Sequence, residues 1–485
     1  MPGIREPGTV IDGYVLEEKI HRGSMAEIWR VRRGDPPVLS VMKIPSFRDT
    51  DDPASLVGFE VEQMILPTLS GVHVPRFIAA GDWAVQPYIV MEHIQSTSLR
   101  SRLDEAPLPP DEVASIGARV AAALHDVHTQ HVIHLDIKPS NVMFREDGAA
   151  VLIDFGVSRH DRLPDLLAEQ FRLPIGTGPY ISPEQIRQIR NDPRSDIFSL
   201  GVLLYYLATN ERPFGNPTSV RGLRQRLYRD PVPPRACNPR CPPWLQEVIL
   251  RCLEIAPADR YQTAAHVAFQ LQHPDQVALT DRAERMSRDG LLTVLKRRFR
   301  SIGEEPDLRR SADDHLSRAP IVAVALDLDQ GSEALAEALL TAARRVLQTQ
   351  PGARLACLTV RKTPRLAMES ALDAEGRSLR MRLLVELQHW ARPLGLGVGR
   401  ITHHVLEGPD PAAEILDFAS SNHVDHVVIG SRGSSTLRRY LGSVSSQVVA
   451  QAVCTVTVVK SRAPEDDTDD GSAEDGRPRY PGLFP

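Results

Sequence analysis

The chain contains little cysteine and no long apolar run. Its five cysteines among 485 residues are sparse and odd in number, which argues against a disulfide framework and for a reducing compartment. No uncharged apolar stretch approaches the roughly 18 to 20 residues that a membrane-spanning helix needs. The N-terminus also lacks the apolar core of a signal peptide. We therefore expect a cytoplasmic protein without a membrane span.

The sequence also has no large excess of charge of one sign. The net charge is −5 at pH 7, so we expect no wholesale binding to nucleic acid. One basic cluster, at 296–300, could touch nucleic acid or anionic lipid, although a solvated linker face is the simpler interpretation. The content of 42% hydrophobic and 25% charged residues is ordinary for a globular protein. The length predicts about two to four domains.

The stretch 134–156 places polar side chains where short apolar segments end. Asp136 and Asn141 stand on one loop, and Asp154 directly follows the apolar run 151–153, which is typical of a buried strand. Phosphoryl transfer needs one carboxylate to orient the attacking hydroxyl and accept its proton. It also needs an amide oxygen and a second carboxylate to hold magnesium on the triphosphate. The stretch therefore predicts a phosphoryl-transfer site.

This spacing resembles the signature of the protein kinases, H-x-D-x-x-x-x-N followed by D-F-G. Residues from about 14 to 275 resemble a bacterial-type serine/threonine protein kinase domain. By this resemblance Asp136 is the catalytic base, Lys138 contacts the transferred phosphate, and Asn141 and Asp154 are the metal ligands. Lys138 in this loop is typical of serine/threonine kinases. The resemblance implies protein substrates and ATP with Mg²⁺, or with Mn²⁺.

Two charged residues upstream complete the set that the resemblance implies. Lys43 lies in a strand-like apolar segment and would position the triphosphate as a point charge. Its expected partner is Glu62, which follows Phe59 as in the family's Phe-x-x-Glu pattern. Glu60 is the alternative partner, but it would face elsewhere on a helix.

The glycines of the phosphate-binding turn are mostly missing. Of the family pattern G-x-G-x-x-G-x-V only Gly23 is present, because His21, Ala26 and Ile28 occupy the other three positions. The resemblance places the nucleotide-binding residues at Ile20, Gly23, Ala26, Ile28, Lys43, Met91, Glu92 and Ile94. Met91 would form a wall of the adenine pocket, and backbone groups of Glu92 and Ile94 would bind the adenine.

The activation segment, residues 157–183, contains few side-chain hydroxyls. The usual positions of phosphorylation in mid-segment are occupied by 165–171, which contain neither serine nor threonine. The family's Arg before the catalytic Asp, which in many kinases binds a phosphate on this segment, is Leu135. We therefore expect either constitutive activity or control from another domain. By the resemblance, Thr177 is expected to form hydrogen bonds close to Asp136 and Lys138.

The pattern changes after residue 318. Strands are expected at 320–326, 354–360, 400–405, 424–430 and 454–459, and helices at 333–347, 365–390, 411–420 and after Gly442. Alternating strands and helices of this length predict a parallel, doubly wound sheet.

Glycines at two strand and helix ends of this region suit phosphate binding by backbone N–H groups. Gly430 and Gly433 follow a strand, and Gly442 and Ser443 open a helix. This resembles the universal stress protein family, whose nucleotide-binding members carry G-x-x-G, nine residues and then G-[ST]; here the gap is eight residues. Asp327 matches the family's strand-end Asp near the adenosine. A second adenine nucleotide here and a dimerisation domain without nucleotide are the two alternatives.

The sequence thus predicts an α+β bilobal kinase fold, with an N-terminal antiparallel sheet plus helix and a helical C-terminal lobe, at 10–275. A charged linker at 276–317, an α/β doubly wound parallel-sheet domain at 318–462 and an acidic disordered tail at 463–485 follow. The predicted function is transfer of the ATP γ-phosphate to protein serine or threonine, in signalling. The C-terminal domain would sense stress or form a homodimer. The alternative, a pseudokinase or nucleotide-binding signalling scaffold, is favoured by the missing glycines alone.

Overall fold

The computed structural model describes residues 5–460 apart from 24–25, 35–38, 46–52, 84–85, 289, 291–293, 299–318, 329–331, 351, 364–378, 398 and 432–441. The predicted tail, most of the predicted linker and the first half of the helix predicted at 365–390 lie outside this range. No helix among the described residues is long and apolar enough to cross a membrane.

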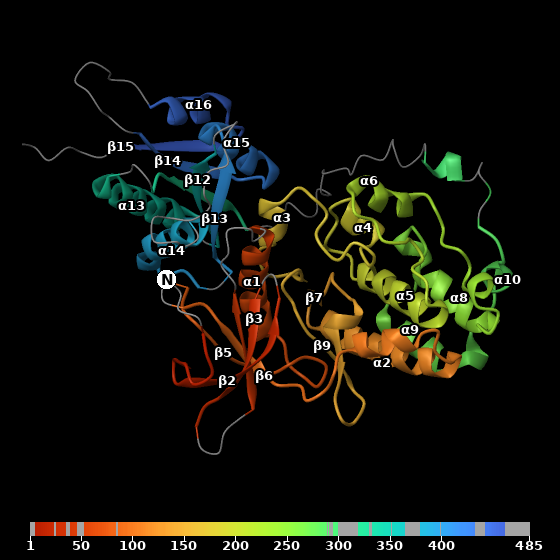
Figure 1. Ribbon diagram of the computed structural model, residues 1–485. Helices are drawn as coiled ribbons and strands as arrows, with labels where there is room; N and C mark the ends of the chain where they lie inside the picture. Colours follow the sequence, from red (N-terminus) through yellow and green to blue (C-terminus); the bar gives the residue numbers. More distant parts are fainter. Residues whose placement is uncertain are drawn as a thin grey trace, which may run out of the picture.

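The N-terminal lobe is a six-stranded antiparallel sheet with one long helix (Figure 1). Its strands are β1 (Val10–Ile11), β2 (Tyr14–Arg22), β3 (Ala26–Arg32), β4 (Ser40–Pro45), β5 (Phe77–Ala80) and β6 (Ile89–Glu92), in the order β1-β2-β3-β4-β6-β5. Alternate residues of β2 to β4, such as Leu16, Trp29 and Met42, are buried together in one apolar cluster. The helix α1 (Pro53–Ile65) continues into a 3-10 turn, η1 (Leu66–Thr68).

The second lobe is mainly helical and is organised around two buried helices. These are α2 (Pro110–Thr129) and α5 (Arg194–Thr209), packed with α8 (Pro243–Cys252) and α9 (Ala264–Gln272). The shorter helices are α3 (Leu166–Gln170), α4 (Pro183–Ile186), α6 (Val220–Leu223), α7 (Pro234–Cys237) and α10 (Asp281–Glu284). The short strands are β7 (Val132–Ile133), β8 (Val142–Phe144), β9 (Ala150–Leu152) and β10 (Arg159–His160).

The C-terminal unit is a five-stranded parallel sheet in the order β13-β12-β11-β14-β15. Its strands are β11 (Ile321–Leu326), β12 (Arg354–Lys362), β13 (Ile401–Gly408), β14 (His426–Ser431) and β15 (Thr455–Lys460). Helices α13 (Glu333–Thr349) and α14 (Leu379–Ala391) cover one face, and α15 (Pro411–Ser421) and α16 (Ser443–Gln451) cover the other. The predicted bilobal fold followed by a doubly wound parallel sheet is confirmed.

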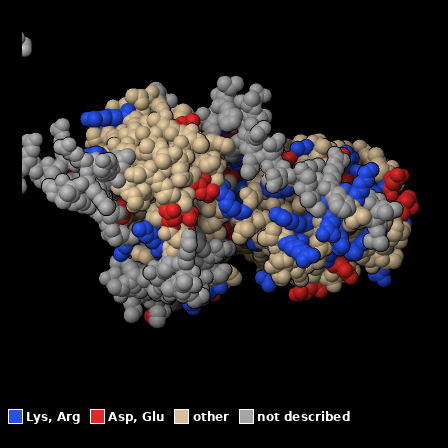
Figure 2. All heavy atoms as spheres, turned by 90° about the horizontal axis from the view of Figure 1, so that it is seen from above, with Lys and Arg blue, Asp and Glu red and all other residues tan. Residues whose placement is uncertain are grey.

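The C-terminal unit contacts both parts that precede it. In Figure 1 the short helix α3 lies beside α1 and β13, away from the other helices of its lobe. Seen from above, Lys and Arg gather on the helical lobe, whereas the visible face of the C-terminal unit carries few charged side chains (Figure 2). On the face seen in Figure 2 the two units therefore differ in charge.

Candidate active site

The loop between β7 and β8 is held from beneath by a buried carboxylate of α5. Asp196 accepts hydrogen bonds from the backbone N–H of His134 at 2.8 Å and of Leu135 at 2.7 Å. It also contacts Nε2 of His128 at 2.8 Å. Leu135 has φ 61°, a left-handed conformation that costs a residue with a Cβ free energy. The bonds to Asp196 stabilise this conformation and so set the direction of the next residue, Asp136.

The predicted catalytic-loop residues converge on the carboxylate of Asp136. Its Oδ2 accepts from Lys138 Nζ at 2.5 Å and from Asn141 Nδ2 at 3.1 Å. Its Oδ1 accepts from the Thr177 backbone N–H at 3.0 Å, and Lys138 Nζ donates to Thr177 Oγ1 at 3.0 Å. The activation segment and the catalytic loop are therefore joined at the predicted base, and the predicted contact of Thr177 is confirmed.

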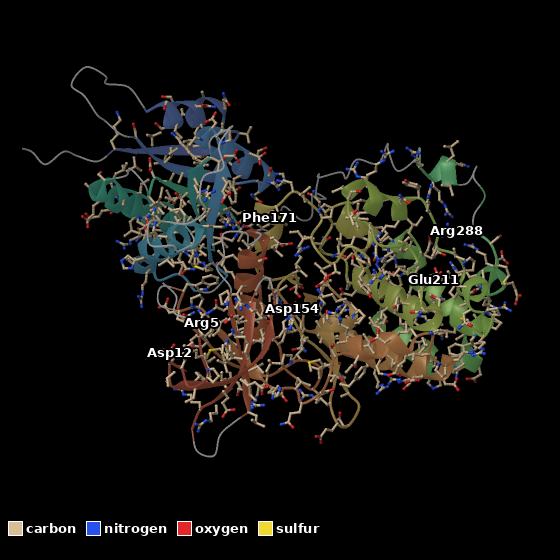
Figure 3. The ribbon with its side chains drawn as sticks, in the orientation of Figure 1. Arg5, Asp12, Asp154, Phe171, Glu211 and Arg288 are labelled. Atoms are coloured by element: carbon tan, nitrogen blue, oxygen red, sulfur yellow. The ribbon has the colours of Figure 1, made fainter. Side chains whose placement is uncertain are left out.

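Lys43 binds one carboxylate of its own lobe and one of the helical lobe. Its Nζ lies 2.5 Å from Glu62 on α1 and 2.9 Å from Asp154, which is labelled in Figure 3. Burial alone would lower the pKa of Lys43, but Asp154 and Glu62 outweigh it and raise that pKa. Burial raises the pKa of Glu62 in spite of Lys43. The expected partner is thus Glu62; the alternative, Glu60, lies in the electrostatic reach of Arg380 instead.

Asn141 and Asp154 present oxygen atoms that suit a hard divalent cation. Because Asn141 uses its amide nitrogen on Asp136, its amide oxygen is left as the donor atom, near Ser140 Oγ. Lys43 lowers the pKa of Asp154 to about 2, against the effect of burial, so this carboxylate is ionised at neutral pH. No group of three or more His, Cys, Asp or Glu among the described residues could hold a metal. The remaining ligands would come from water and phosphates, as is usual for Mg²⁺.

The nucleotide-binding residues expected from the sequence lie on β2, β3, β4 and β6, in the β2–β3 turn and just after β6. At the β2–β3 turn the Gly23 N–H donates to the Ala26 carbonyl at 3.0 Å, and the His21 ring lies close to Gly23. Residues 24–25 at the turn lie outside the described residues. Ile20 is exposed, and Ile28 pairs with Lys43 across β3 and β4.

The end of β6 and the connection after it carry the three residues expected around the adenine. Met91 and Ile94 are buried. The Glu92 carboxylate bonds to Arg145 at 2.5 and 3.0 Å, so only its backbone could read an adenine, as expected. The Arg145 bonds also tie this connection to the helical lobe.

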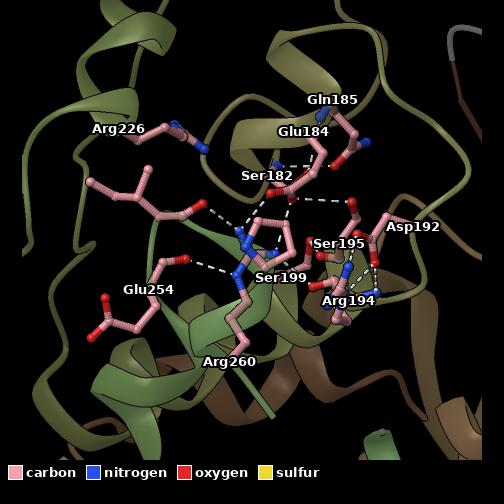
Figure 4. A network of polar contacts seen from close by, with 12 residues as sticks. Ser182, Glu184, Gln185, Asp192, Arg194, Ser195, Ser199, Arg226, Glu254 and Arg260 are labelled. Carbon is pink, nitrogen blue, oxygen red and sulfur yellow. Dashed lines mark hydrogen bonds and ion pairs between the residues drawn. The ribbon is translucent and has the colours of Figure 1, made fainter. Parts of the chain in front are cut away.

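A buried ion pair supports the end of the activation segment (Figure 4). Glu184 lies 2.8 Å from Arg260, and Arg260 also donates to the carbonyls of Glu254, Arg194 and Ile255. Gln185 donates to the Leu135 carbonyl at 2.8 Å, which connects this region to the catalytic loop.

The glycine and serine residues expected to bind a nucleotide in the C-terminal unit are only partly described. Gly430 is the penultimate residue of β14. Gly442 is the N-cap of α16, its N–H donates to Ser431 Oγ at 3.4 Å, and Ser443 is the first residue of α16. Asp327 is exposed just after β11, and Gly433 lies outside the described residues. A Cβ at Gly430 would lie 2.9 Å from Leu335 of α13. Helix packing therefore explains this glycine without a nucleotide.

Sequence reasoning missed one buried polar cluster. Glu169 of α3 contacts Arg354 of β12 and His404 of β13. The only local signal was an acidic residue at a position where the family often carries a phosphorylated hydroxyl.

Comparison with known proteins assigns both units to families. The model of the protein kinase domain matches residues 14–274, and the model of the universal stress protein family matches residues 320–460. A serine/threonine-protein kinase PknB of Mycolicibacterium smegmatis is 32% identical over 292 residues, which cover 58% of this chain and 47% of PknB. A serine/threonine-protein kinase PknL of Mycobacterium tuberculosis is 32% identical over 277 residues, covering 56% of this chain and 68% of PknL.

The solved PknI kinase domain of Mycobacterium tuberculosis is 23% identical, covers 56% of this chain and 100% of that chain, and has a TM-score of 0.44. The chain thus spans less than half of PknB and about two thirds of PknL. Its kinase match covers more than half of its own 485 residues, and a separate family match follows it. The chain belongs to the protein kinase family and carries a universal stress protein domain after its kinase domain.

Proposed function

We propose that the chain is a serine/threonine protein kinase that transfers the γ-phosphate of ATP to hydroxyls of protein substrates. The observation that carries the proposal is the convergence of Lys138, Asn141 and Thr177 on the carboxylate of Asp136. The kinase family uses ATP and a divalent metal ion, for which Mg²⁺ or Mn²⁺ is proposed here. The cation would neutralise phosphate charge, held by Asn141 and Asp154.

The residues of the site divide the work. Asp136 orients the acceptor hydroxyl and takes its proton. Lys138, already bonded to Thr177, neutralises charge on the transferred group. Lys43, fixed by Glu62, positions the triphosphate. The complete set leaves the alternative of a pseudokinase scaffold without support beyond the missing glycines.

The test is phosphate transfer by the purified full chain. Radiolabelled ATP and a generic acceptor protein are incubated with Mg²⁺ or Mn²⁺, and the labelled amino acids are identified. We expect phosphoserine and phosphothreonine. Asp136→Asn should lower kcat by about 10²–10⁴-fold, the usual contribution of a general base. Absence of transfer by the wild-type chain with either metal would overturn the proposal.

For the universal stress protein domain we propose sensing or homodimer formation, with a second adenine nucleotide as the alternative. The N-terminus of α16 supports the nucleotide, since Gly442 opens a nine-residue helix beside the end of β14. The packing of Gly430 on Leu335 supports the domain without nucleotide. Titration of the full-length Asp136→Asn variant with ATP and AMP distinguishes them, because two binding events require the second site. Cytoplasmic localisation and a role in signalling stay predictions.

A further inference from the structure

The helix α3 forms the middle of the activation segment, and its two ends are anchored to different domains. Asp165 caps α3 by accepting from the Ala168 N–H at 3.2 Å. The same carboxylate accepts from Arg190 at 2.9 Å, and Arg190 donates to the Val157 carbonyl. These bonds attach the start of α3 to the helical lobe. Phe171, just after α3, packs on the kinase core (Figure 3).

The other end of α3 is attached to the universal stress protein domain by charge. The Glu169 side chain is 10% exposed, and its two oxygens lie 2.5 and 3.2 Å from the Arg354 guanidinium. His404 Nε2 lies 3.2 Å from the same carboxylate. Burial would raise the pKa of Glu169, but Arg354 and His404 outweigh it and lower that pKa to about 2. Glu169 is therefore a buried anion whose countercharge comes from the other domain.

Gln170 extends this contact along β13 and to α14. Its Nε2 donates to His404 Nδ1 at 3.0 Å, which leaves the His404 proton on Nε2, near Thr402 Oγ1 at 2.8 Å and Glu169 at 3.2 Å. Its Oε1 accepts from Arg380 of α14 at 2.7 Å. Asn422 Nδ2 also donates to the Glu169 carbonyl at 3.3 Å. β13 is the edge strand of the sheet that the described residues form, and α3 lies against it.

The same domain also holds α1, the helix that carries Glu62. Leu56 of α1 and Trp83 pack against the apolar cluster that α13 and α14 form on the sheet. Trp83 makes an edge-on contact with Phe59 at 5.6 Å between ring centroids. On the other side of α1, Gly58 lies against the backbone of Gly156. The universal stress protein domain thus contacts both the helix that carries Glu62, α1, and the activation segment.

We propose that the universal stress protein domain is a built-in activator of the kinase. Arg354 binds Glu169 in the way that, in many kinases, the Arg before the catalytic Asp binds a phosphate on the activation segment. In this chain Leu135 stands at the position of that Arg, and the middle of the segment contains no serine or threonine. Arg354 therefore takes the place of the Arg, and Glu169 takes the place of the phosphorylated residue. The site with the contact formed has Lys43 paired with Glu62 and Thr177 bound to Asp136, the arrangement that transfer requires. This inference rests on the proposed kinase function.

The test compares full-length charge variants of the contact. Arg354→Met leaves the Glu169 carboxylate without its cation, and Glu169→Gln leaves the Arg354 guanidinium without its anion. For each variant we expect at least about a tenfold decrease in kcat. KM for ATP should change far less, because neither residue touches the nucleotide site. The exchanged double variant, Glu169→Arg with Arg354→Glu, should be more active than either of its single variants. Arg345→Met, at an exposed arginine of α13, is the matched control and should behave as the wild type.

Hydrogen exchange of the same proteins provides a readout that does not depend on catalysis. The amides of α3 should exchange faster in Arg354→Met than in the wild type, while those of α5 stay unchanged, which also shows that the variant is folded. If the single variants are as active as the wild type, or if hydrogen exchange in α3 is unchanged, the proposal that this domain activates the kinase is overturned. If the wild type transfers no phosphate, the proposed kinase function fails, and the exchange experiment still decides whether the contact exists.

Discussion

Replacing Asp196 by Asn should uncouple the catalytic loop from α5. The Asp196 side chain is fully buried and accepts from two consecutive backbone N–H groups, of His134 and Leu135. An Asn side chain has one acceptor oxygen, and its amide nitrogen can only donate. One of the two backbone groups would therefore lose its acceptor and face a second donor.

The magnitude follows from these bonds. A hydrogen bond to a charged group contributes about 1.5–3 kcal/mol, and a buried donor left without a partner costs about 1–3 kcal/mol. The left-handed conformation of Leu135 stores about 1–3 kcal/mol that these bonds offset. Because the hydrogen-bond free energy lost in the variant equals or exceeds the strain of Leu135, the Leu135 backbone can relax to another conformation. The Asp136 side chain is then no longer held in its position. We expect the free energy of unfolding of the kinase domain to fall by about 2–4 kcal/mol, and kcat to fall about 10–100-fold.

The assay combines urea denaturation with phosphate transfer. Hydrogen exchange at 134–141 follows the loop directly and should rise in Asp196→Asn. The matched control is Asp111→Asn at an exposed position of α2, for which neither quantity should change. Wild-type stability together with wild-type kcat in Asp196→Asn would refute the reasoning that these two bonds position Asp136.

Two further predictions concern buried charges away from the reacting atoms. Arg260→Met should destabilise the helical lobe by about 3–5 kcal/mol in urea denaturation, since it strands the buried Glu184; adding Glu184→Leu should recover part of the loss but not all, because three carbonyls still lose Arg260. Equal stability of the single and double variants would contradict this. Burial, reinforced by Glu169 and opposed by Arg380, raises the pKa of Glu60 to about 7. The contribution of Glu60 to the free energy of unfolding is then fully present below about pH 4.3, and it is lost progressively as the pH rises through about 7. Glu60→Gln should therefore be more stable relative to wild type at pH 8 than at pH 5, and an equal difference at both pH values would show that Glu60 titrates normally.

Much of the fold and of the site could be read from local patterns. The residues around Asp136 lie within one loop, and the next essential carboxylate, Asp154, follows a short apolar strand, so their spacing alone indicated the chemistry. The pairing of Lys43 with Glu62 required the family resemblance to choose between two glutamates. The structure supports the choice because Glu60 and Glu62 stand on different faces of α1.

The sequence by itself determined the order of the domains and the residue types of the catalytic loop, because strand and helix periodicity and loop spacing are local properties. Only the tertiary structure decided what covers α3. Periodicity says which side of an element is buried but not against what, and Glu169 meets Arg354 across 185 positions of chain. It also placed Leu335 of α13 against Gly430, which gives this glycine a packing role beside the phosphate-binding role that its spacing predicts. A glycine that avoids a side chain and one that admits a ligand look alike until the neighbouring helix is in place.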